Sequence, residues 1–552
     1  MFPYAVETFS AEEEDVLRRY VTNLDKPVFA LVNLPEVVKG ALFARYSRSS
    51  KSLRRLFLDE FVGELDIAGD ATVDATVGLK RAEDLYQRVF LEYGDDSVAQ
   101  LGGVHLACEQ ASNVLTKVLE RGRLMAYLEQ STRYIPYNSR LNSGHYRYYR
   151  DPALLRSPLG ARYVGEMDRM FDTYGELLEE LQVWLAQRHP RQPGDSDFVH
   201  RQAVRAKALD ALRGLLPAAS LSNVGIYGSG QSFELLLLRM RSHPLREARQ
   251  YADLMLEELR KVIPSFLQRV DRPDRGGVWS DYLAGTRRDS AELVESLLPE
   301  LAAPTGGGVA GPSGEPSVTL VDYDPDGEDK VITAICSPLT AAGEQQVAER
   351  VVRLGAEEKR SLLRAYVGER SNRRHRPGRA FERTGYRFDV VTDYGAFRDL
   401  QRHRMLTIEW QPLGTRLGYD VPGVVEGAGL SGRYVASLER SRQLCEALAP
   451  AFPVESAYAV ALAFRIRYTM QMNAREAMHL IELRSGAQGH PSYRWVAQEM
   501  HRQIAERAGH RLLAEAMSHV DFGADELERL EAERRAEERR NSLFAAGNPA
   551  IR

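Results

Sequence analysis

Apolar residues recur at steps of three and four along much of the first half of the chain. The stretches AEDLYQRVFLEYG (82–94) and EARQYADLMLEELRKVI (247–263) show this spacing clearly. It places the apolar side chains on one face of a helix. The pattern therefore predicts that the first half is mostly helical.

A different pattern begins at residue 317. The stretch SVTLVDYDPDGEDKVITAICSP (317–338) alternates on both sides of an Asp-Gly pair, which predicts two paired strands. Helical spacing resumes in AEEKRSLLRAYVGERSNRR (356–374), and YRFDVVTDYGAFRDL (386–400) predicts another strand. The mixture indicates a helix-rich α+β protein.

Glycine, proline and serine replace the periodic pattern in APTGGGVAGPSGEPS, residues 303–317, which is typical of a linker. A chain of 552 residues is also too long for one hydrophobic core. We therefore predict a first domain over residues 1–302 and a similar second domain over residues 318–552. The second domain ends in ADELERLEAERRAEERR, where glutamates stand four residues before arginines, as in an exposed charged helix.

Composition narrows the class of function. Hydrophobic residues make up 44% of the chain, charged residues 27%, and the formal net charge is −4, all ordinary for a folded soluble protein. No run approaches the roughly 20 apolar residues that a membrane span requires. The amino terminus is acidic where a secretory signal is basic and apolar. We expect a cytoplasmic protein, with nucleic acid an unlikely main partner.

The three cysteines, Cys108, Cys336 and Cys445, are far apart in the sequence. This spacing argues against a disulfide framework and gives no zinc-ligand pattern. None of them adjoins a candidate motif. We expect them to be small core residues, and we predict no metal site.

Two related stretches carry the candidate chemistry: RGRLMAYLEQSTRY (121–134) and RHRMLTIEWQPLGTR (402–416). Both begin with R-x-R and run through an apolar segment into glutamine. In the first, a carboxylate, an amide, a hydroxyl and a guanidinium follow one another, a set suited to a phosphate with a sugar or base. In the second, Pro412 stands at the position of Ser131 and offers neither a hydroxyl nor a backbone N–H.

The first stretch, R-x-R-x7-S ending in Ser-x-Arg-Tyr, resembles the signature R-H-R-x7-S of the flavin-dependent thymidylate synthases, also called thymidylate synthase complementing proteins. Gly122 replaces the central histidine of that signature, whereas the second stretch keeps R-H-R intact. Downstream, LDALRGLLP matches a nucleotide element of the family, and MNAREAMHLIELRS matches its flavin helix. HRPGRAFE partly matches a third element, a histidine followed by Phe-Glu.

The resemblance implies that the two halves divide the work. It implies nucleotide binding by Arg121, Glu129, Gln130, Ser131, Arg133 and Arg213. It implies flavin binding by Arg402, His403, Arg404, Asn473, Arg475, His479, His375 and Glu382. It places Arg484 against the uracil carbonyl as the catalytic residue, where a fixed positive charge stabilises the electron density that arrives with the hydride.

The implied reaction is the reductive methylation of dUMP to dTMP. Methylene tetrahydrofolate supplies the carbon, reduced FAD supplies the hydride, and NADPH reloads the flavin. The family builds its sites at subunit boundaries of a homotetramer, so a tandem chain is expected to form a homodimer that imitates four domains. One composite inter-domain site per pair of halves would then suffice, and each half would be free to lose different groups.

Two other interpretations remain open at this point. One is a relative that binds flavin or nucleotide without turnover, since Gly122 and Pro412 each damage one copy of the motif. The other is an arginine-rich nucleic-acid binder that uses the basic segment 370–379.

Overall fold

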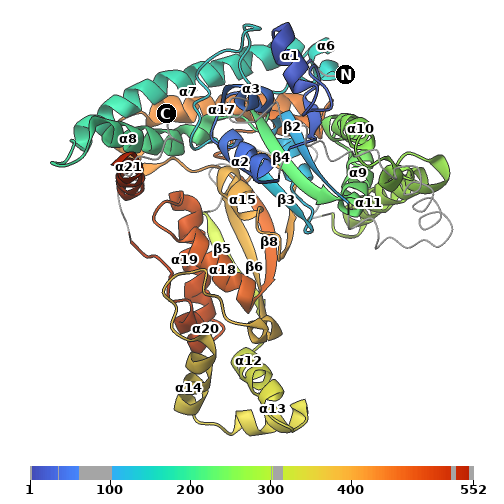
Figure 1. Ribbon diagram of the computed structural model, residues 1–552. Coiled ribbons are helices and arrows are strands. Elements are labelled where there is room, and N and C mark those ends of the chain that lie inside the picture. Colours follow the sequence, from blue (N-terminus) through green and yellow to red (C-terminus); the bar gives the residue numbers. More distant parts are fainter. Residues whose placement is uncertain are drawn as a thin grey trace. The chain divides into compact units, whose positions relative to one another are not determined.

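The computed structural model describes residues 3–34, 36–60, 102–299, 301, 315–523, 527 and 530–545. Two four-stranded antiparallel sheets and many helices make up these residues (Figure 1). The predicted mixed α+β class with two tandem domains of the same kind is confirmed. Most of the predicted linker lies outside the described residues, because the structure describes only 315–317 of it.

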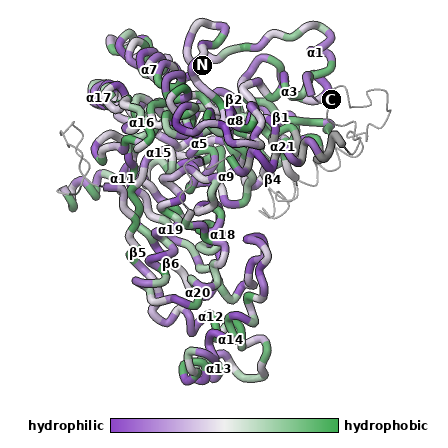
Figure 2. Tube along the Cα trace, turned by 90° about the vertical axis from the view of Figure 1, so that its left-hand side faces the viewer, coloured by the Kyte–Doolittle hydropathy of each residue, from purple (hydrophilic) through white to green (hydrophobic). Residues whose placement is uncertain are grey.

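The described chain forms two compact units. Unit 1 comprises Met1–Gly175, Leu216–Gly308 and Ala436–Ala461, and unit 2 comprises Glu176–Leu215, Val309–Val435 and Leu462–Arg552. Each unit therefore takes most of one half of the sequence and one shorter segment of the other half. Two of the boundaries fall inside long helices, one in α7 (Gly160–Arg188) and one in α17 (Ser431–Leu448). Along α7, hydrophilic and hydrophobic residues alternate within successive turns, as amphipathic packing requires (Figure 2).

The sheet of unit 1 has the strand order β1-β2-β4-β3. Its strands are β1 (Val28–Leu31), β2 (Gly103–Ser112), β3 (Met125–Glu129) and β4 (Leu221–Ser229). Its helices are α1 (Ala11–Leu17), α2 (Glu36–Tyr46), α3 (Leu53–Glu60), α5 (Asn113–Leu119), α6 (Pro152–Arg156), α9 (Gly230–Arg241), α10 (Arg246–Arg260) and α11 (Val278–Leu297). Helix α10 packs against β1 and α9.

The sheet of unit 2 has the corresponding order β5-β6-β8-β7. Its strands are β5 (Ser317–Tyr323), β6 (Gly385–Asp393), β7 (Thr407–Trp410) and β8 (Arg465–Asn473). Its helices are α8 (Asp197–Leu212), α12 (Gly327–Cys336), α13 (Glu344–Val352), α14 (Ala356–Val367), α15 (Tyr394–Leu400), α16 (Gly423–Gly427), α18 (Ala474–Arg484), α19 (Pro491–Glu506), α20 (Arg511–Ala516) and α21 (Leu530–Ala545). Short 3-10 turns η4 (Arg213–Leu215) and η8 (Arg379–Arg383) complete the part that matters for the site.

The same local device joins strand to helix at four junctions. The last residue of each central strand, Ser112, Ser229, Asp393 or Asn473, caps the next helix by accepting a hydrogen bond from a backbone N–H three residues later. Such caps satisfy donors that have no partner within the helix. Each of the two central strands in a sheet therefore leads directly into a helix. Because both units repeat this arrangement, it fixes where the motifs lie in each.

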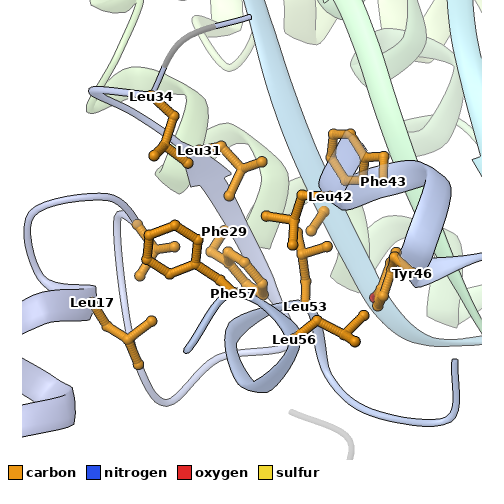
Figure 3. Close-up of a cluster of buried hydrophobic side chains, with 12 residues drawn as sticks. Leu17, Phe29, Leu31, Leu34, Leu42, Phe43, Tyr46, Leu53, Leu56 and Phe57 are labelled. Atoms are coloured by element: carbon orange, nitrogen blue, oxygen red, sulfur yellow. The ribbon is translucent and has the colours of Figure 1, made fainter. Parts of the chain in front are cut away.

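A cluster of buried apolar side chains holds the amino-terminal part of unit 1 together (Figure 3). It joins α1, β1, α2 and α3 through residues such as Leu17, Phe29 and Phe57. The buried carboxylate of Glu109 accepts hydrogen bonds from Tyr46 Oη at 3.0 Å and from the backbone N–H of Leu53 at 2.8 Å. The cluster fastens these helices to strand β2.

The prediction of two paired strands in residues 317–338 is wrong for the second strand. The segment before the Asp-Gly pair forms β5, but the segment after it forms helix α12. Glu328 and Asp329 lie in the first turn of α12, where carboxylates favour the positive end of the helix dipole. Val331 and Ile335, four residues apart, are both buried on one face. The β-branched residues of this segment gave it a sequence pattern typical of a strand.

The segment between Tyr134 and Arg213, which the sequence left unassigned, forms α6, α7 and α8. The charged carboxyl-terminal helix is α21, and it is less solvated than predicted, because Arg534 Nε donates to Asp195 Oδ1 at 2.6 Å. In the described part of the chain, no helix has the length and apolar character to cross a membrane.

Candidate functional site

The two R-x-R motifs occupy equivalent positions in the two sheets. Ala126 on β3 pairs with Tyr227, two residues before the helix cap Ser229. Thr407 on β7 pairs with Gln471, two residues before the helix cap Asn473. Counting back five residues from each strand position gives the first arginine of each motif. The two motifs are therefore two copies of one structural element.

In unit 1, the side chain of Glu129 is buried and already paired. Its carboxylate lies 3.1 Å from Nζ of Lys117, which is also 2.5 Å from the carboxylate of Glu120. These three side chains are nearly inaccessible, with 2% exposure at Lys117. Glu129, which was predicted to bind a sugar or base, is thus already engaged by Lys117 inside unit 1.

Gln130 and Ser131 lie in a well-bonded turn after β3. The Gln130 amide donates to the carbonyl of Ser49 at 2.5 Å and accepts from Arg147 at 3.2 Å. The Ser131 hydroxyl accepts from the backbone N–H of Arg133 at 3.2 Å. Local side-chain bonds of this type hold a turn in place. Arg133 is buried as well.

Gly122 belongs to a tight corner beside β3. A Cβ atom at this position would lie 2.5 Å from Tyr127 Oη and 3.1 Å from Met125 Sδ. The histidine of the family signature would therefore require the side chains of Tyr127 and Met125 to shift. Arg121, one residue earlier, is exposed.

In unit 2, His403 is buried, with 2% of its side chain exposed, and both ring nitrogens are engaged. Nδ1 lies 3.0 Å from Glu476 Oε1, and Arg484 Nε donates to Nε2 at 2.9 Å. Glu476 also lies 3.4 Å from His479 Nδ1. The structure thus brings two predicted residues, His403 and His479, to one carboxylate that the sequence did not single out, and places Arg484 on the other ring nitrogen of His403.

These contacts determine where the proton of His403 resides. A guanidinium only donates, so Nε2 must be the unprotonated acceptor and Nδ1 must carry the hydrogen. Burial, with Arg484, lowers the pKa of His403 to about 4 although Glu476 opposes the shift. Burial would raise the pKa of Glu476, but hydrogen bonds from His403 and His479 outweigh it and lower the pKa to about 2. His403 is therefore neutral and Glu476 ionised at pH 7.

His403, Glu476 and His479 also have a spacing that a metal ion can use, with ligand atoms within 4.8 Å of one another. A metal on Nδ1 of His403 would require a hydrogen on Nε2. That hydrogen would point at the N–H of Arg484, which cannot accept it. The three side chains therefore fit a hydrogen-bonded cluster and do not fit a metal centre.

Three of the remaining flavin candidates, Asn473, Arg475 and Glu382, lie around the start of α18. Asn473 uses its side-chain oxygen to cap α18. Arg475 donates to the carbonyl of Pro377 at 3.0 Å and to Glu382 at 3.3 Å, so it ties η8 to α18. His375 is exposed and bonds to Asn372 at 3.2 Å. Arg404, also predicted to hold flavin, is exposed as well.

The basic segment 370–379 is anchored by its first residue. Arg370 makes a double hydrogen bond to Glu482, with both distances 2.6 Å and both side chains 2% exposed. Arg370 therefore does not belong to an exposed basic surface. Arg373, Arg374 and Arg376 are exposed.

Arg213 lies in unit 2, although it comes from the first half of the sequence. Its Nη1 donates to Asp399 at 3.1 Å, and Asp399 also pairs with Arg402 of the second motif. Its Nη2 lies 3.9 Å from Asp393. Among the described residues, Nε and Nη2 are buried without a hydrogen-bond partner. One nucleotide candidate and one flavin candidate thus share a carboxylate.

The structure groups the candidates by unit. Unit 1 holds Arg121, Glu129, Gln130, Ser131 and Arg133. Unit 2 holds Arg213, Arg402, His403, Arg404, Asn473, Arg475, His479, Arg484, His375 and Glu382. Sequence reasoning missed Glu476 and Asp399. Glu476 carried a usable signal, because it stands three residues from both Asn473 and His479 on one helix.

Comparison with known proteins finds relatives that match most of the chain and a solved structure that matches part of it. A UPF0159 protein of Chlamydia muridarum is 38% identical over 531 residues, covering 96% of this chain and 98% of its own. A UPF0159 protein of Thermoplasma acidophilum is 32% identical over 522 residues, covering 90% and 97%. A solved UMP/dUMP methylase, PolB from Streptomyces cacaoi with bound 5-Br dUMP, is 20% identical with a TM-score of 0.29, covering 38% of this chain and 96% of that one.

The family model described as thymidylate synthase complementing protein matches residues 41–265 and again residues 319–508. The two matches correspond to the two halves that carry the equivalent motifs. Together with the relatives above, they show that this chain belongs to the thymidylate synthase complementing protein family, in a tandem form.

Proposed function

We propose that the protein is a flavin-dependent thymidylate synthase that converts dUMP to dTMP, with methylene tetrahydrofolate and NADPH as co-substrates. Family membership supports a thymidylate synthase-like methyltransferase. The observation that carries the finer proposal is the shared carboxylate of Asp399. It joins Arg213, at the nucleotide position of the first half, to Arg402 of the R-H-R motif in the second half.

Arg213 is suited to bind an anion. Its Nε and Nη2 are buried and lack hydrogen-bond partners among the described residues. Buried donors without partners are costly, so such a group favours a ligand that accepts from it. We assign the phosphate of dUMP to Arg213. Gln130, Ser131 and Arg133 are proposed to complete nucleotide binding from the same chain or from a second copy in a homodimer.

FAD fits the donor set near α18. Arg475 is 38% exposed along its side chain, and Arg404 and His375 are exposed, so guanidinium and imidazole donors are accessible for a pyrophosphate. When bound, the flavin supplies the hydride that the chain's own residues cannot supply. His403 differs from these residues because both ring nitrogens are engaged, and we therefore give it an orienting role.

Arg484 is proposed to face the uracil carbonyl. Its Nε is held by His403, and its guanidinium lies 5.5 Å from the centroid of the Tyr493 ring. A fixed positive charge in a sheltered position stabilises electron density that builds up on the carbonyl oxygen during hydride transfer. A cysteine nucleophile has no support, because burial raises the pKa of all three thiols, that of Cys445 to about 11.

The test combines spectroscopy with complementation. The purified protein is expected to show flavin absorbance after incubation with FAD and to form dTMP from dUMP, methylene tetrahydrofolate and NADPH. Its gene is expected to rescue a thymidine-requiring strain, whereas Arg484→Ala is not. Arg433→Ala, which breaks only exposed pairs with Glu176 and Glu180, is the matched control and should rescue. Light scattering checks the proposed homodimer.

A family member that binds without turnover is the second candidate. It is favoured by Glu129 and Gln130, whose side chains are already bonded within unit 1. Flavin and dUMP binding without rescue would select this candidate. Absence of flavin and dUMP binding, together with retention on a single-stranded DNA column, would instead support the nucleic-acid reading of the exposed segment 371–379.

A further inference from the structure

We infer that Glu476 is a positioning residue: it holds His403 as the neutral Nδ1–H form, so that Nε2 accepts from Arg484 and fixes the orientation of the guanidinium. We call Glu476, His403 and Arg484 the relay. What Arg484 faces rests on the proposed function. The arrangement of the relay itself does not depend on it.

The two bonds to His403 are chemically complementary. On one side the ring needs an acceptor for Nδ1–H, and Glu476 provides it at 3.0 Å. On the other side Nε2 accepts from Arg484 Nε at 2.9 Å. His403 is nearly inaccessible, so water offers no competing partner. Either bond alone favours this tautomer, and together they leave no alternative that satisfies all three groups.

The charges around His403 are also balanced. The charged and titratable side chains with the largest effect on it are Glu476, Arg484 and His479. The ionised carboxylate and the guanidinium flank a neutral ring, so a buried positive charge has its counter-charge one side chain away. A second proton on His403 would break the bond to Arg484 and place two cations together.

The relay has a consequence for Arg484. Because Nε is committed to His403, only the two terminal nitrogens of the guanidinium can form the edge that meets a ligand. The guanidinium is planar and presents its donors in a rigid fork. Fixing one corner of that fork therefore fixes its plane, which is the pre-organisation that stabilisation of developing charge requires.

The other copy of the motif supports treating the relay as one unit. Measured from the helix caps Ser229 and Asn473, Ser232 is equivalent to Glu476 and Met240 to Arg484. Gly122 is equivalent to His403 through the register of β3 and β7. All three members are therefore absent from one copy and present in the other, as expected of groups that work only together.

The first experiment needs no substrate. The protein is labelled with ¹⁵N-histidine, and the His403 signals are assigned by their loss in His403→Gln, or in His403→Asn if the first variant does not fold. At pH 6, we expect a neutral ring with the hydrogen on Nδ1. A charged ring, an Nε2–H ring, or coordination of added Zn²⁺ by His403 would overturn the relay.

The second experiment is a double-mutant cycle on dUMP affinity and turnover. Glu476→Gln and His403→Gln are each expected to lower kcat/KM by about tenfold or more, in the range found for residues that orient a ligating group. The double variant should be no worse than His403→Gln, because both changes break the same relay. Independent, multiplicative losses would overturn the proposal. Glu506→Gln, an exposed carboxylate on α19, is the matched control and should change nothing.

The two experiments separate two kinds of failure. A wild-type protein without dUMP binding or turnover would refute the proposed function, and the histidine spectrum would still decide on the relay. A wild-type protein with full activity but a charged or Nε2–H His403 would refute the relay alone.

Discussion

The guanidinium of Arg213 donates a 3.1 Å hydrogen bond to Asp399, which lies 186 positions further along the chain. The bond lies within unit 2, since α8 and η4 of the first half belong to that unit. Asp399 stands three residues before the R-H-R motif, so one carboxylate orients a residue from each half. The first half thus contributes directly to the surroundings of the motif that only the second half keeps intact.

Removal of Arg213 should destabilise unit 2 and weaken nucleotide binding. Arg213→Ala leaves the buried carboxylates of Asp393 and Asp399 with less counter-charge, and breaking a buried pair in this way costs roughly 3 kcal/mol. Urea unfolding measures the loss. Arg433→Ala, which breaks an exposed pair, should cost less than about 1 kcal/mol. Equal midpoints for the two variants would contradict the structural role of Arg213.

The anchor of segment 371–379 can be tested by a pair of arginines. Arg370→Ala leaves Glu482 buried without its double hydrogen bond, and a loss of about 3–5 kcal/mol is expected. Arg374→Ala removes an exposed side chain and should change stability by less than about 0.5 kcal/mol. Thermal unfolding of the two variants provides the comparison. A stable Arg370→Ala protein would show that the ion pair does not anchor the segment.

Acid should destabilise the protein partly through His403. Its pKa is about 4 in the folded state against an ordinary 6.5, so the unfolded chain binds this proton first as the pH falls. The contribution is complete above pH 6.5 and is lost between 6.5 and 4, on the order of 3 kcal/mol. The unfolding midpoint of His403→Gln should therefore vary less with pH over this window than that of the wild type.

Replacement of exposed His375 by Gln serves as the control for this pH series and should leave the wild-type curve unchanged. Glu476, whose pKa is about 2, adds a loss in the same direction only below its ordinary value of 4.5. Measurements from pH 7.5 to 5 therefore exclude the titration of Glu476. Other groups that titrate in this range, such as Glu247 with its pKa raised to about 7, cancel in the difference between His403→Gln and the wild type. Parallel curves for His403→Gln and wild type would show that His403 is not held neutral by its surroundings.

Replacing Gly122 by alanine, which adds only a methyl group, should destabilise the protein. The Cβ of Gly122→Ala would lie 2.5 Å from Tyr127 Oη, and such overpacking costs about 1–3 kcal/mol. Adding Tyr127→Phe removes the clashing atom, so the double variant should lose less than the two single losses combined. Gly165→Ala in α7 meets no atom within 4 Å and should be neutral or slightly stabilising. Unchanged stability of Gly122→Ala would show that this corner can relax.

Much of the fold was predictable because helix periodicity and strand runs are local signals. The order of motifs identified two related halves, and the strand register places those motifs at equivalent positions. Helix α12 was predicted to be a strand because its β-branched residues favour a strand, although its acidic first turn favours a helix. A prediction from local sequence patterns fails where the strand signal and the helix signal of one segment disagree.

The candidate site was predictable only in its residue types. Arg213 and Asp399 are brought together by the exchange of a segment between units, and no local spacing encodes that exchange. The helical spacing of Glu476 from Asn473 and His479 was a usable signal for the residue, but Glu476 and His403 are 73 positions apart, so their contact became visible only through the hydrogen bond itself. Arg370 appeared to belong to a basic surface because its partner, Glu482, lies 112 positions further along the chain.

The exchange of segments has a consequence for the synthesis of the protein. Unit 2 contains Glu176–Leu215, and unit 1 contains Ala436–Ala461. A nascent chain that has left the ribosome only as far as residue 300 therefore possesses neither unit in full. Unit 1 is complete only when residue 461 has been translated, so we expect part of its apolar surface to stay uncovered until then. Genes that encode the halves separately would yield fragments that mature only when expressed together.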